Sequence, residues 1–174
     1  PGAGKGTQSI LIAEKMGLKH LSTGEILRKA VSDGTPLGLK AKEVMDSGNL
    51  VSDEIMVGII KDAISANDAK NGFILDGFPR TIEQAKELDK IMESLGYSAA
   101  RVINITLDDE ELVRRMLGRG RKDDTEETIK NRLKVYKEQT APVREHYSSK
   151  SAVFDIYGIG SISEINNKIL EVLK

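Results

Sequence analysis

The stretch Pro1-Gly2-Ala3-Gly4-Lys5-Gly6-Thr7-Gln8 carries the strongest indication of the fold. Three glycines alternate around one lysine, and a helical pattern over residues 9–16 follows directly. Glycine lets the backbone approach an anion closely, and the first amides of a helix point towards such an anion. The stretch therefore predicts a phosphate-binding loop, in which Lys5 reaches the β- and γ-phosphates and Thr7 reaches a magnesium ion.

Two features depart from the usual loop pattern G-x-x-x-x-G-K-[ST]. Its first glycine would fall before residue 1, and the hydroxyl of Thr7 follows Lys5 by two positions instead of one. The strand that normally leads into such a loop would also precede residue 1. A flexible, glycine-rich terminus is therefore an open alternative for this stretch taken alone, and the rest of the chain has to decide.

Composition restricts the classes of protein and partner. A chain of 174 residues with 39% apolar and 30% charged residues is typical of one soluble, helix-rich domain. A net charge of −1 argues against a general nucleic-acid binder. No apolar run has the length of a membrane span and no signal peptide is visible, so we expect no membrane partner. The absence of cysteine excludes disulfides and thiolate zinc sites, and fits a reducing compartment.

Helical and strand-like patterns alternate along the whole chain. Strands separated by helices favour a parallel α/β sandwich, in which ligands bind at the carboxyl ends of the strands. Capping-box patterns begin at Ser22, Thr81 and Ser161, and a looser one begins at Asp124. Pro142 is expected to kink or divide the longest helix. The expected strands are 19–21, 72–76, 101–106 and 152–156, and the expected helices are 9–16, 22–32, 36–46, 52–66, 81–95, 109–117, 125–148 and 161–174.

Two residues at the end of the second strand are candidates for phosphate chemistry. Asp76 ends a short buried strand, where a phosphate-binding α/β protein needs a carboxylate to hold magnesium or its waters. Arg80 follows on a turn made rigid by Pro79 and open to a ligand at Gly77. An ordinary turn aspartate and a surface arginine are the simpler alternatives.

Arginines are concentrated in one part of the chain. Arg114, Arg115, Arg119 and Arg121 fall within eight residues, and Arg132 lies one helix later. The planar guanidinium suits phosphate oxygens, and clustered cations need anions to neutralise them. The alternative is a solvated helix face paired with acidic residues 108–111, for example through Glu111 and Arg115. His20 has no His or Cys partner at ligand spacing and is expected to be structural.

Several motifs, taken together, resemble adenylate kinases over the whole chain. They include the opening stretch, His20-Leu-Ser-Thr-Gly-Glu-Ile-Leu-Arg28, Leu50-Val-Ser-Asp-Glu54, Gly72-Phe-Ile-Leu-Asp-Gly-Phe-Pro-Arg-Thr81, Gly118-Arg-Gly-Arg-Lys-Asp-Asp124 and Thr140-Ala-Pro-Val143. This family places Gly or Ser between the lysine and the threonine of the loop, which accounts for the unusual spacing.

The resemblance implies an α/β P-loop nucleotide kinase fold with a parallel five-stranded sheet. It implies one domain over residues 1–174, with a core of 1–21, 52–117 and 129–174. A nucleoside monophosphate-binding insertion would occupy 22–51 and a lid 118–128. The lid is very short, with four residues between Arg119 and Asp124, and the absence of cysteine rules out the zinc lid of some members. The family's first strand, expected beside the strand ending at Asp76, would precede Pro1, so we expect an N-terminally incomplete sequence of a complete enzyme. Made as given, the chain should have poor stability and weak activity.

The resemblance also implies roles for individual residues. The catalytic residues would be Lys5, Arg80, Arg119, Arg121 and Arg132. ATP would contact Gly2, Ala3, Gly4, Lys5, Gly6, Thr7, Arg115, Arg119 and Gly160. AMP would contact Thr23, Arg28, Asn49, Leu50, Val51, Gly77, Phe78, Pro79, Arg80, Gln84, Arg121 and Arg132. Thr7 and Asp76 would serve the magnesium ion, partly through water.

The activity implied is reversible phosphoryl transfer from MgATP to AMP, giving two ADP, by a cytoplasmic monomer. A UMP/CMP kinase is the nearest alternative, but such enzymes tend to have Ala in place of Thr23. The hydroxyl of Thr23 and the amide of Gln84 suit an adenine edge, because an amide donates and accepts at once. A nucleotide-binding protein without catalysis is the other alternative, although it would not need Arg28, Arg80, Arg121 and Arg132 together.

Overall fold

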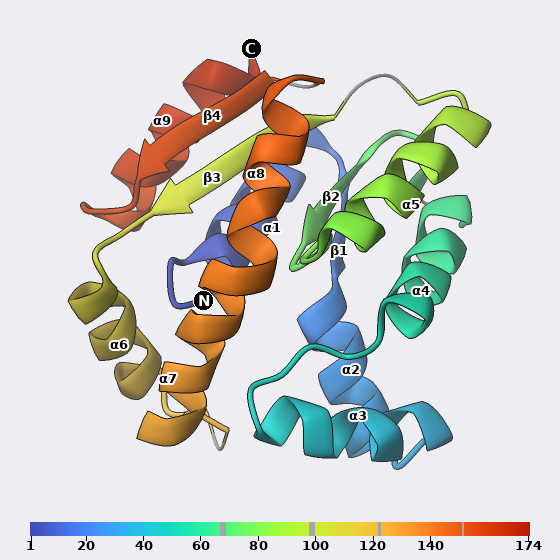
Figure 1. Cartoon of the computed structure of the whole chain (residues 1–174). Coiled ribbons are helices and arrows are strands. Elements are labelled where there is room, and N and C mark those ends of the chain that lie inside the picture. Colours follow the sequence, from blue (N-terminus) through green and yellow to red (C-terminus); the bar gives the residue numbers. More distant parts are fainter. Residues whose placement is uncertain (67–68, 98–99, 122, 151) are drawn as a thin grey trace.

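The computed structural model describes residues 1–66, 69–97, 100–121, 123–150 and 152–174. Strands and helices alternate as expected, which confirms an α/β fold (Figure 1). The strands are β1 (Lys19–Ser22), β2 (Phe73–Asp76), β3 (Arg101–Thr106) and β4 (Ala152–Tyr157). The helices are α1 (Lys5–Met16), α2 (Thr23–Ser32), α3 (Pro36–Asp46), α4 (Asp53–Ser65), α5 (Ile82–Ser94), α6 (Asp109–Gly118), α7 (Glu126–Val135), α8 (Ala141–Ser148) and α9 (Ile162–Leu173).

The described strands form two parallel pairs. β1 pairs with β2, which places Ser22 opposite Asp76, and β3 pairs with β4. Within the described part of the chain, no hydrogen-bonded ladder joins β2 to β3, so there are two sheets of two strands in place of one five-stranded sheet.

Helices pack around both pairs and form a core in several parts. Next to β1 and β2, the largest part includes Ile60 and Ile64 of α4 and Leu88 of α5. On the other side of the molecule, Ile12 of α1 contacts Ile156 and α9. α1 therefore packs between the two strand pairs, and the loop that precedes it is held near the carboxyl ends of β1 and β2 (Figure 1).

Helix α1 begins four residues earlier than predicted. Gly4 has φ of 87°, a left-handed conformation that glycine adopts without steric cost, and the helix starts at the next residue. The predicted end of this helix at residue 16 is confirmed, because Gly17 follows with φ of 66° and its amide donates to the carbonyl of Ala13.

The long helix predicted over residues 125–148 is divided. α7 and α8 are separated by a π-helical turn, Tyr136–Thr140, and Pro142 lies in the first turn of α8. Proline has no amide proton and cannot continue the regular hydrogen-bond ladder, so the ladder shifts register before it. The prediction that Pro142 divides this helix is confirmed.

The capping predictions had mixed outcomes. Ser161 forms a full capping box with Glu164, and Thr81 accepts from the amide of Gln84. The predictions for Ser22 and Asp124 were wrong. The hydroxyl of Ser22 donates to Asp76 instead of capping α2. Thr125 caps α7, while the carboxylate of Asp124 binds two arginines.

The segment predicted as the monophosphate-binding insertion, residues 22–51, contains α2, α3 and the chain that returns to α4. Thr35 caps α3 and Pro36 begins it, so α3 starts sharply after α2. Thr128 and Asn131 of α7 bind the carbonyls of Asp46 and Ser47 at 3.0 and 2.8 Å. Contacts from α7 therefore hold the far end of this segment. None of the described helices is long and apolar enough to cross a membrane.

Candidate functional site

The glycine-rich loop is packed against the protein. Ala3 is buried with Leu112 and Met116 of α6. Gly2 has φ of 78°, and a Cβ atom there would lie 2.9 Å from the carbonyl oxygen of Leu112. Glycine is thus required at this position both for its conformation and for space. The loop turns directly into the first amides of α1, as a phosphate-binding loop does.

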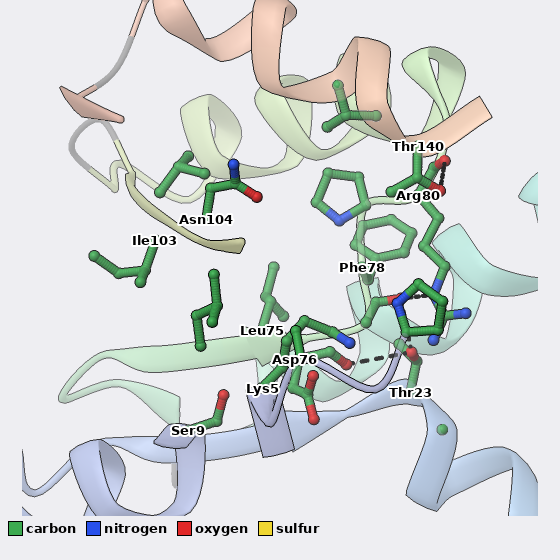
Figure 2. Close-up of a pocket in the computed structure, with 18 of the residues that line it drawn as sticks. Lys5, Ser9, Thr23, Leu75, Asp76, Phe78, Arg80, Ile103, Asn104 and Thr140 are labelled. Carbon is green, nitrogen blue, oxygen red and sulfur yellow. Dashed lines mark hydrogen bonds between the residues drawn. The ribbon is translucent and has the colours of Figure 1, made fainter. Parts of the chain in front are cut away.

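A cavity of about 1200 Å³ opens beside this loop. Figure 2 shows Lys5, Asp76, Thr23 and Arg80 around one part of it, with Ile103 and Asn104 of β3 across from Leu75 of β2. Most residues predicted to bind nucleotides line it. These are Ala3, Lys5, Thr23, Arg28, Asn49, Leu50, Val51, Gly77, Phe78, Pro79, Arg80, Gln84, Arg119, Arg121 and Arg132.

Some predicted residues lie away from the cavity wall. Thr7 is exposed on the first turn of α1, and Gly160 is exposed on the loop after β4. Arg115 binds Glu111 at 2.6 Å and the carbonyl of Gly158 at 3.0 Å, which attaches α6 to the loop that contains Gly160. Arg115 and Gly160 are therefore close to each other, beside the cavity and not among its lining residues.

Lys5 lines the cavity beside Asp76, and its side chain is exposed (Figure 2). Partial desolvation in the cavity lowers its pKa, and the nearby charge of Arg80 lowers that pKa further, whereas Asp76 opposes the shift. Arg119 and Arg121 act in the same direction as Arg80. A cation surrounded by other cations is stabilised by an anion, and a polyphosphate supplies the required negative charge.

Asp76 lies against the loop at the end of β2. Its Oδ2 atom would be 3.3 Å from a Cβ atom at Gly6, 3.4 Å from the hydroxyl of Ser22 and 3.8 Å from Nε2 of His20. Nε2 of His20 is buried and has no hydrogen-bond partner within the described residues. Among the described side chains, no three His, Cys, Asp or Glu residues gather as a metal cage. One carboxylate with a hydroxyl and water fits magnesium, which keeps several of its waters in protein sites.

Arg80 is fixed from three directions. Its Nε donates to the carbonyl of Gly77 at 2.7 Å, and its amide donates to Oε1 of Gln84 at 2.7 Å. Thr140, at the end of the π-helical turn, donates to its carbonyl at 2.9 Å (Figure 2). Burial lowers the pKa of Arg80, Asp76 opposes that shift, and Arg132 and Arg28 add to it. Arg80 is therefore a preorganised cation beside other cations.

The arginine cluster divides into two groups. Arg114 and Arg115 both bind Glu111, so the alternative of a paired helix face is confirmed for these two. Arg119 and Arg132 instead share the carboxylate of Asp124, whose side chain is 1% exposed, and Arg132 also binds Asp123. Arg121 lines the cavity, and its pKa is lowered by partial burial, Arg119 and Arg28. Residue 122, within the predicted lid, lies outside the described residues.

The residues predicted for AMP surround the other end of the cavity. The hydroxyl of Thr23 donates to the carbonyl of Gly77 at 3.0 Å, and its side chain is buried. Phe78 and Val51 are buried apolar walls. The side-chain oxygen of Asn49 accepts from Asn131 at 2.9 Å, so α7 holds the segment that carries Leu50.

Sequence reasoning missed four residues that support this site: Asp53, Asp123, Asn131 and Thr140. Thr140 lies in the motif Thr140–Val143, which assigns it no role. The capping pattern at Asp124 does not indicate its true partners, Arg119 and Arg132. An acidic pair beside an arginine cluster was the available signal for Asp123. Asp53 lies in the motif Leu50–Glu54, but the motif gives no role to its carboxylate, whose partner Gln84 is 31 residues away. No local pattern indicates Asn131, whose partner Asn49 is 82 residues away.

Comparisons with known proteins agree with this arrangement. A family model described as adenylate kinase matches residues 1–152. An adenylate kinase of Leptospira biflexa serovar Patoc is 51% identical over 175 residues, covering 98% of this chain and 94% of the relative. An adenylate kinase of Corynebacterium aurimucosum is 46% identical, with 99% of this chain and 94% of the relative covered. Adenylate kinase 1 of Synechocystis sp. is 45% identical, covering 100% of this chain and 93% of the relative. The chain therefore belongs to the adenylate kinase family.

Proposed function

We propose that the protein catalyses the reversible reaction MgATP + AMP ⇌ MgADP + ADP. The observation that carries this proposal is the convergence of Lys5, Arg80, Arg119, Arg121 and Arg132 on one cavity beside a phosphate-binding loop. Four of these five cations come from segments distant from the loop in sequence. A protein that only held a nucleotide would not need so many cations around the transferring group.

On the donor side, residues 2–7 and Lys5 hold the phosphates of ATP. The amides at the start of α1 and the ammonium of Lys5 neutralise charge on the β- and γ-phosphates. Arg119 contacts the same nucleotide, and Arg115 with the loop at Gly160 forms the side that receives its base. The pairing of Arg115 with the carbonyl of Gly158 supports this, since it fixes that loop next to α6.

On the acceptor side, Arg28 and Arg80 hold the phosphate of AMP, and the base lies among Thr23, the 49–51 segment and Gln84. Because Thr23 donates its only hydroxyl proton to Gly77, it can only accept from a base. The exocyclic amino group of adenine is a donor, whereas the 4-oxo group of uracil is an acceptor. This favours AMP over UMP as the acceptor nucleotide.

The chemistry needs positioning and charge neutralisation more than proton transfer. The attacking phosphate oxygen of AMP is already ionised at neutral pH, so no general base is required. Arg121 and Arg132 stabilise charge on the transferring phosphoryl group, with Lys5 and Arg80 on either side of it. Movement of the 22–51 and 118–128 segments over both nucleotides would exclude water and suppress hydrolysis of ATP.

We propose that magnesium enters with ATP and is held by Asp76, through water, and by Thr7. When bound, it neutralises charge between the β- and γ-phosphates. The position of the Asp76 carboxylate against Gly6 supports this assignment. We also propose that the enzyme is a cytoplasmic monomer, since one chain supplies both nucleotide sites.

The test is ADP formation by the purified protein with MgATP and, in turn, AMP, CMP or UMP. We expect AMP to be preferred by roughly tenfold or more, the discrimination that a matched pair of base contacts provides. Preference for CMP or UMP would identify the pyrimidine kinase instead. Nucleotide binding without ADP formation would show that the site binds nucleotides but does not catalyse the transfer. Light scattering measures the molar mass and so tests whether the protein is a monomer.

A further inference from the structure

Both ends of the Gln84 amide are bonded to protein groups. The amide of Arg80 donates to Oε1 at 2.7 Å, and Nε2 donates to Oδ1 of Asp53 at 2.8 Å. Gln84 is on α5 and is 2% exposed, whereas Asp53 is the first residue of α4. The helix that follows the 22–51 segment therefore supplies a carboxylate to a residue that lines the nucleotide cavity.

Thr81 closes the same network. Its hydroxyl donates to Oδ1 of Asp53 at 3.0 Å and accepts from the backbone amide of Gln84 at 3.1 Å. One carboxylate oxygen thus receives two hydrogen bonds, and both come from the start of α5. Such a closed network restricts χ rotation of Gln84 more than either hydrogen bond alone.

The two protein groups bonded to the Gln84 side chain determine the orientation of its amide. A backbone amide can only donate and an ionised carboxylate can only accept. With Arg80 on one side and Asp53 on the other, only one orientation of the Gln84 amide satisfies both groups. Within the described residues, its second amide proton and second oxygen lone pair have no protein partner, and Gln84 lines the cavity.

We infer that Asp53 is a positioning residue for nucleotide selection. It holds the nitrogen end of the Gln84 amide so that one N–H and one lone pair face the acceptor base in a fixed order. Adenine presents an amino donor next to a ring-nitrogen acceptor, and hypoxanthine presents a carbonyl acceptor next to an N–H donor. A fixed amide matches adenine and opposes hypoxanthine, and this inference rests on the proposed binding of AMP at Gln84.

The experiment measures the dissociation constants of AMP and IMP by calorimetry, with kcat and the KM for ATP, for the wild type, four single variants and one double variant. Asp53→Ala removes the acceptor, whereas Asp53→Asn keeps an oxygen that can accept the same two hydrogen bonds. Glu54→Ala is the matched control, because it removes an exposed carboxylate from the same helix turn. Gln84→Ala, alone and combined with Asp53→Ala, completes a double-mutant cycle.

We expect Asp53→Ala to raise the dissociation constant of AMP by roughly tenfold, the effect of losing one charge-assisted hydrogen bond, and to raise that of IMP by less. The KM for ATP should not change in Asp53→Ala. Asp53→Asn and Glu54→Ala should bind AMP with nearly the wild-type dissociation constant. In the Gln84→Ala background, Asp53→Ala should cause little further loss of AMP binding.

An equal loss of affinity for AMP and IMP in Asp53→Ala would overturn the inference. Additive effects of the two substitutions on AMP binding would also overturn it, because either result indicates a general structural role. If Gln84→Ala weakens AMP and Asp53→Ala does not, only the inference about Asp53 fails. If Gln84→Ala leaves AMP binding unchanged, the assignment of Gln84 within the proposed function fails as well.

Discussion

Arg132 and Asp124 form an ion pair in which the carboxylate is almost completely buried, with 1% of its side chain exposed. Arg119 donates to both oxygens of the same carboxylate, and it shares Oδ1 with Arg132. Arg132 belongs to α7 and Arg119 lies at the end of α6, so Asp124 fixes two cations from two helices beside the cavity. These cations are preorganised because the protein, and not the nucleotide, determines their positions.

Replacement of Asp124 by alanine should therefore reduce both turnover and stability. Two arginines lose their shared partner, and displacement of catalytic groups by about 1 Å can reduce a rate by about 100-fold. We expect kcat to fall by roughly 10- to 100-fold and the free energy of unfolding to fall by about 1–3 kcal/mol. Steady-state kinetics and urea unfolding measure these two effects.

The exposed pair of Glu87 and Lys90 on α5 provides the control. Glu87→Ala should change the free energy of unfolding by no more than about 1 kcal/mol and should leave kcat unchanged. Wild-type turnover in Asp124→Ala would contradict a role for this carboxylate in placing Arg119 and Arg132.

Stability should depend on pH through Asp124. Burial alone would raise the pKa of Asp124, but the hydrogen bond and charge of Arg119 and the charge of Arg132 outweigh burial and lower it. A carboxylate whose pKa is lowered by folding stabilises the native state fully at pH values above its unfolded-state pKa. This stabilisation is lost as the pH falls through the folded-state pKa. The difference in unfolding free energy between wild type and Asp124→Asn should thus be largest near pH 7 and shrink below about pH 4.

Urea unfolding at several pH values between about 7 and about 3 checks this dependence. Asparagine keeps the size of the side chain and removes its titration, so the comparison isolates one group. A difference that stays constant over the whole pH range would show that the ion pairs of Asp124 contribute no pH-dependent stability.

Lys5 should be needed for turnover and dispensable for folding. Lys5 is exposed towards the cavity and makes no core contact, and partial desolvation and the charge of Arg80 lower its pKa, so Lys5→Met should not destabilise the folded protein. We expect kcat to fall by about 100- to 1000-fold, as for loss of one preorganised electrostatic contact. The melting temperature should stay the same or rise, and Lys40→Met, on the exposed face of α3, should change neither property.

The parts of the fold that depend on local pattern could be predicted from the sequence. The alternation of strands and helices, the strand ending at Asp76 and the glycine end of α1 follow from periodicity and from residues with special backbone preferences. The early start of α1 at Lys5 could not be predicted from periodicity, because it depends on the left-handed conformation of Gly4.

The supporting residues of the site were harder to predict for a physical reason. A lysine in a glycine-rich loop can be recognised from eight consecutive residues, whereas the contact between Asp53 and Gln84 exists only after two helices pack together. Asp124 satisfies a weak capping pattern, and only the fold shows that its carboxylate faces Arg119 and Arg132. Motifs predict which groups bind phosphate, and tertiary structure identifies the groups that hold those side chains in place.

Magnesium dependence should be altered by a change at Asp76. Asp76→Asn keeps the shape of the side chain and removes the charge beside Gly6. The magnesium concentration for half-maximal rate should rise by roughly 10- to 100-fold, and a chelator should abolish turnover of the wild type without changing its melting temperature. A variant with the magnesium dependence of the wild type would exclude Asp76 from the metal site.

Gly38 should be required for the packing of α3 against α2. A Cβ atom at Gly38 would lie 2.0 Å from the carbonyl oxygen of Ala30, a distance that no side chain can occupy without moving the backbone. Gly38→Ala should thus separate the two helices, lower the free energy of unfolding by about 1–3 kcal/mol and raise the KM for AMP more than the KM for ATP.

Gly58 of α4 is the matched control, because it is also a helical glycine and a Cβ atom there would meet nothing within 4 Å. Gly58→Ala should raise the free energy of unfolding by roughly 0.5–1 kcal/mol, since alanine loses less backbone freedom on folding. Urea unfolding and the two KM values distinguish the variants. Equal changes in the KM for AMP and for ATP in Gly38→Ala would contradict a specific role of the 22–51 segment in binding AMP, since a general loss of structure affects both nucleotides.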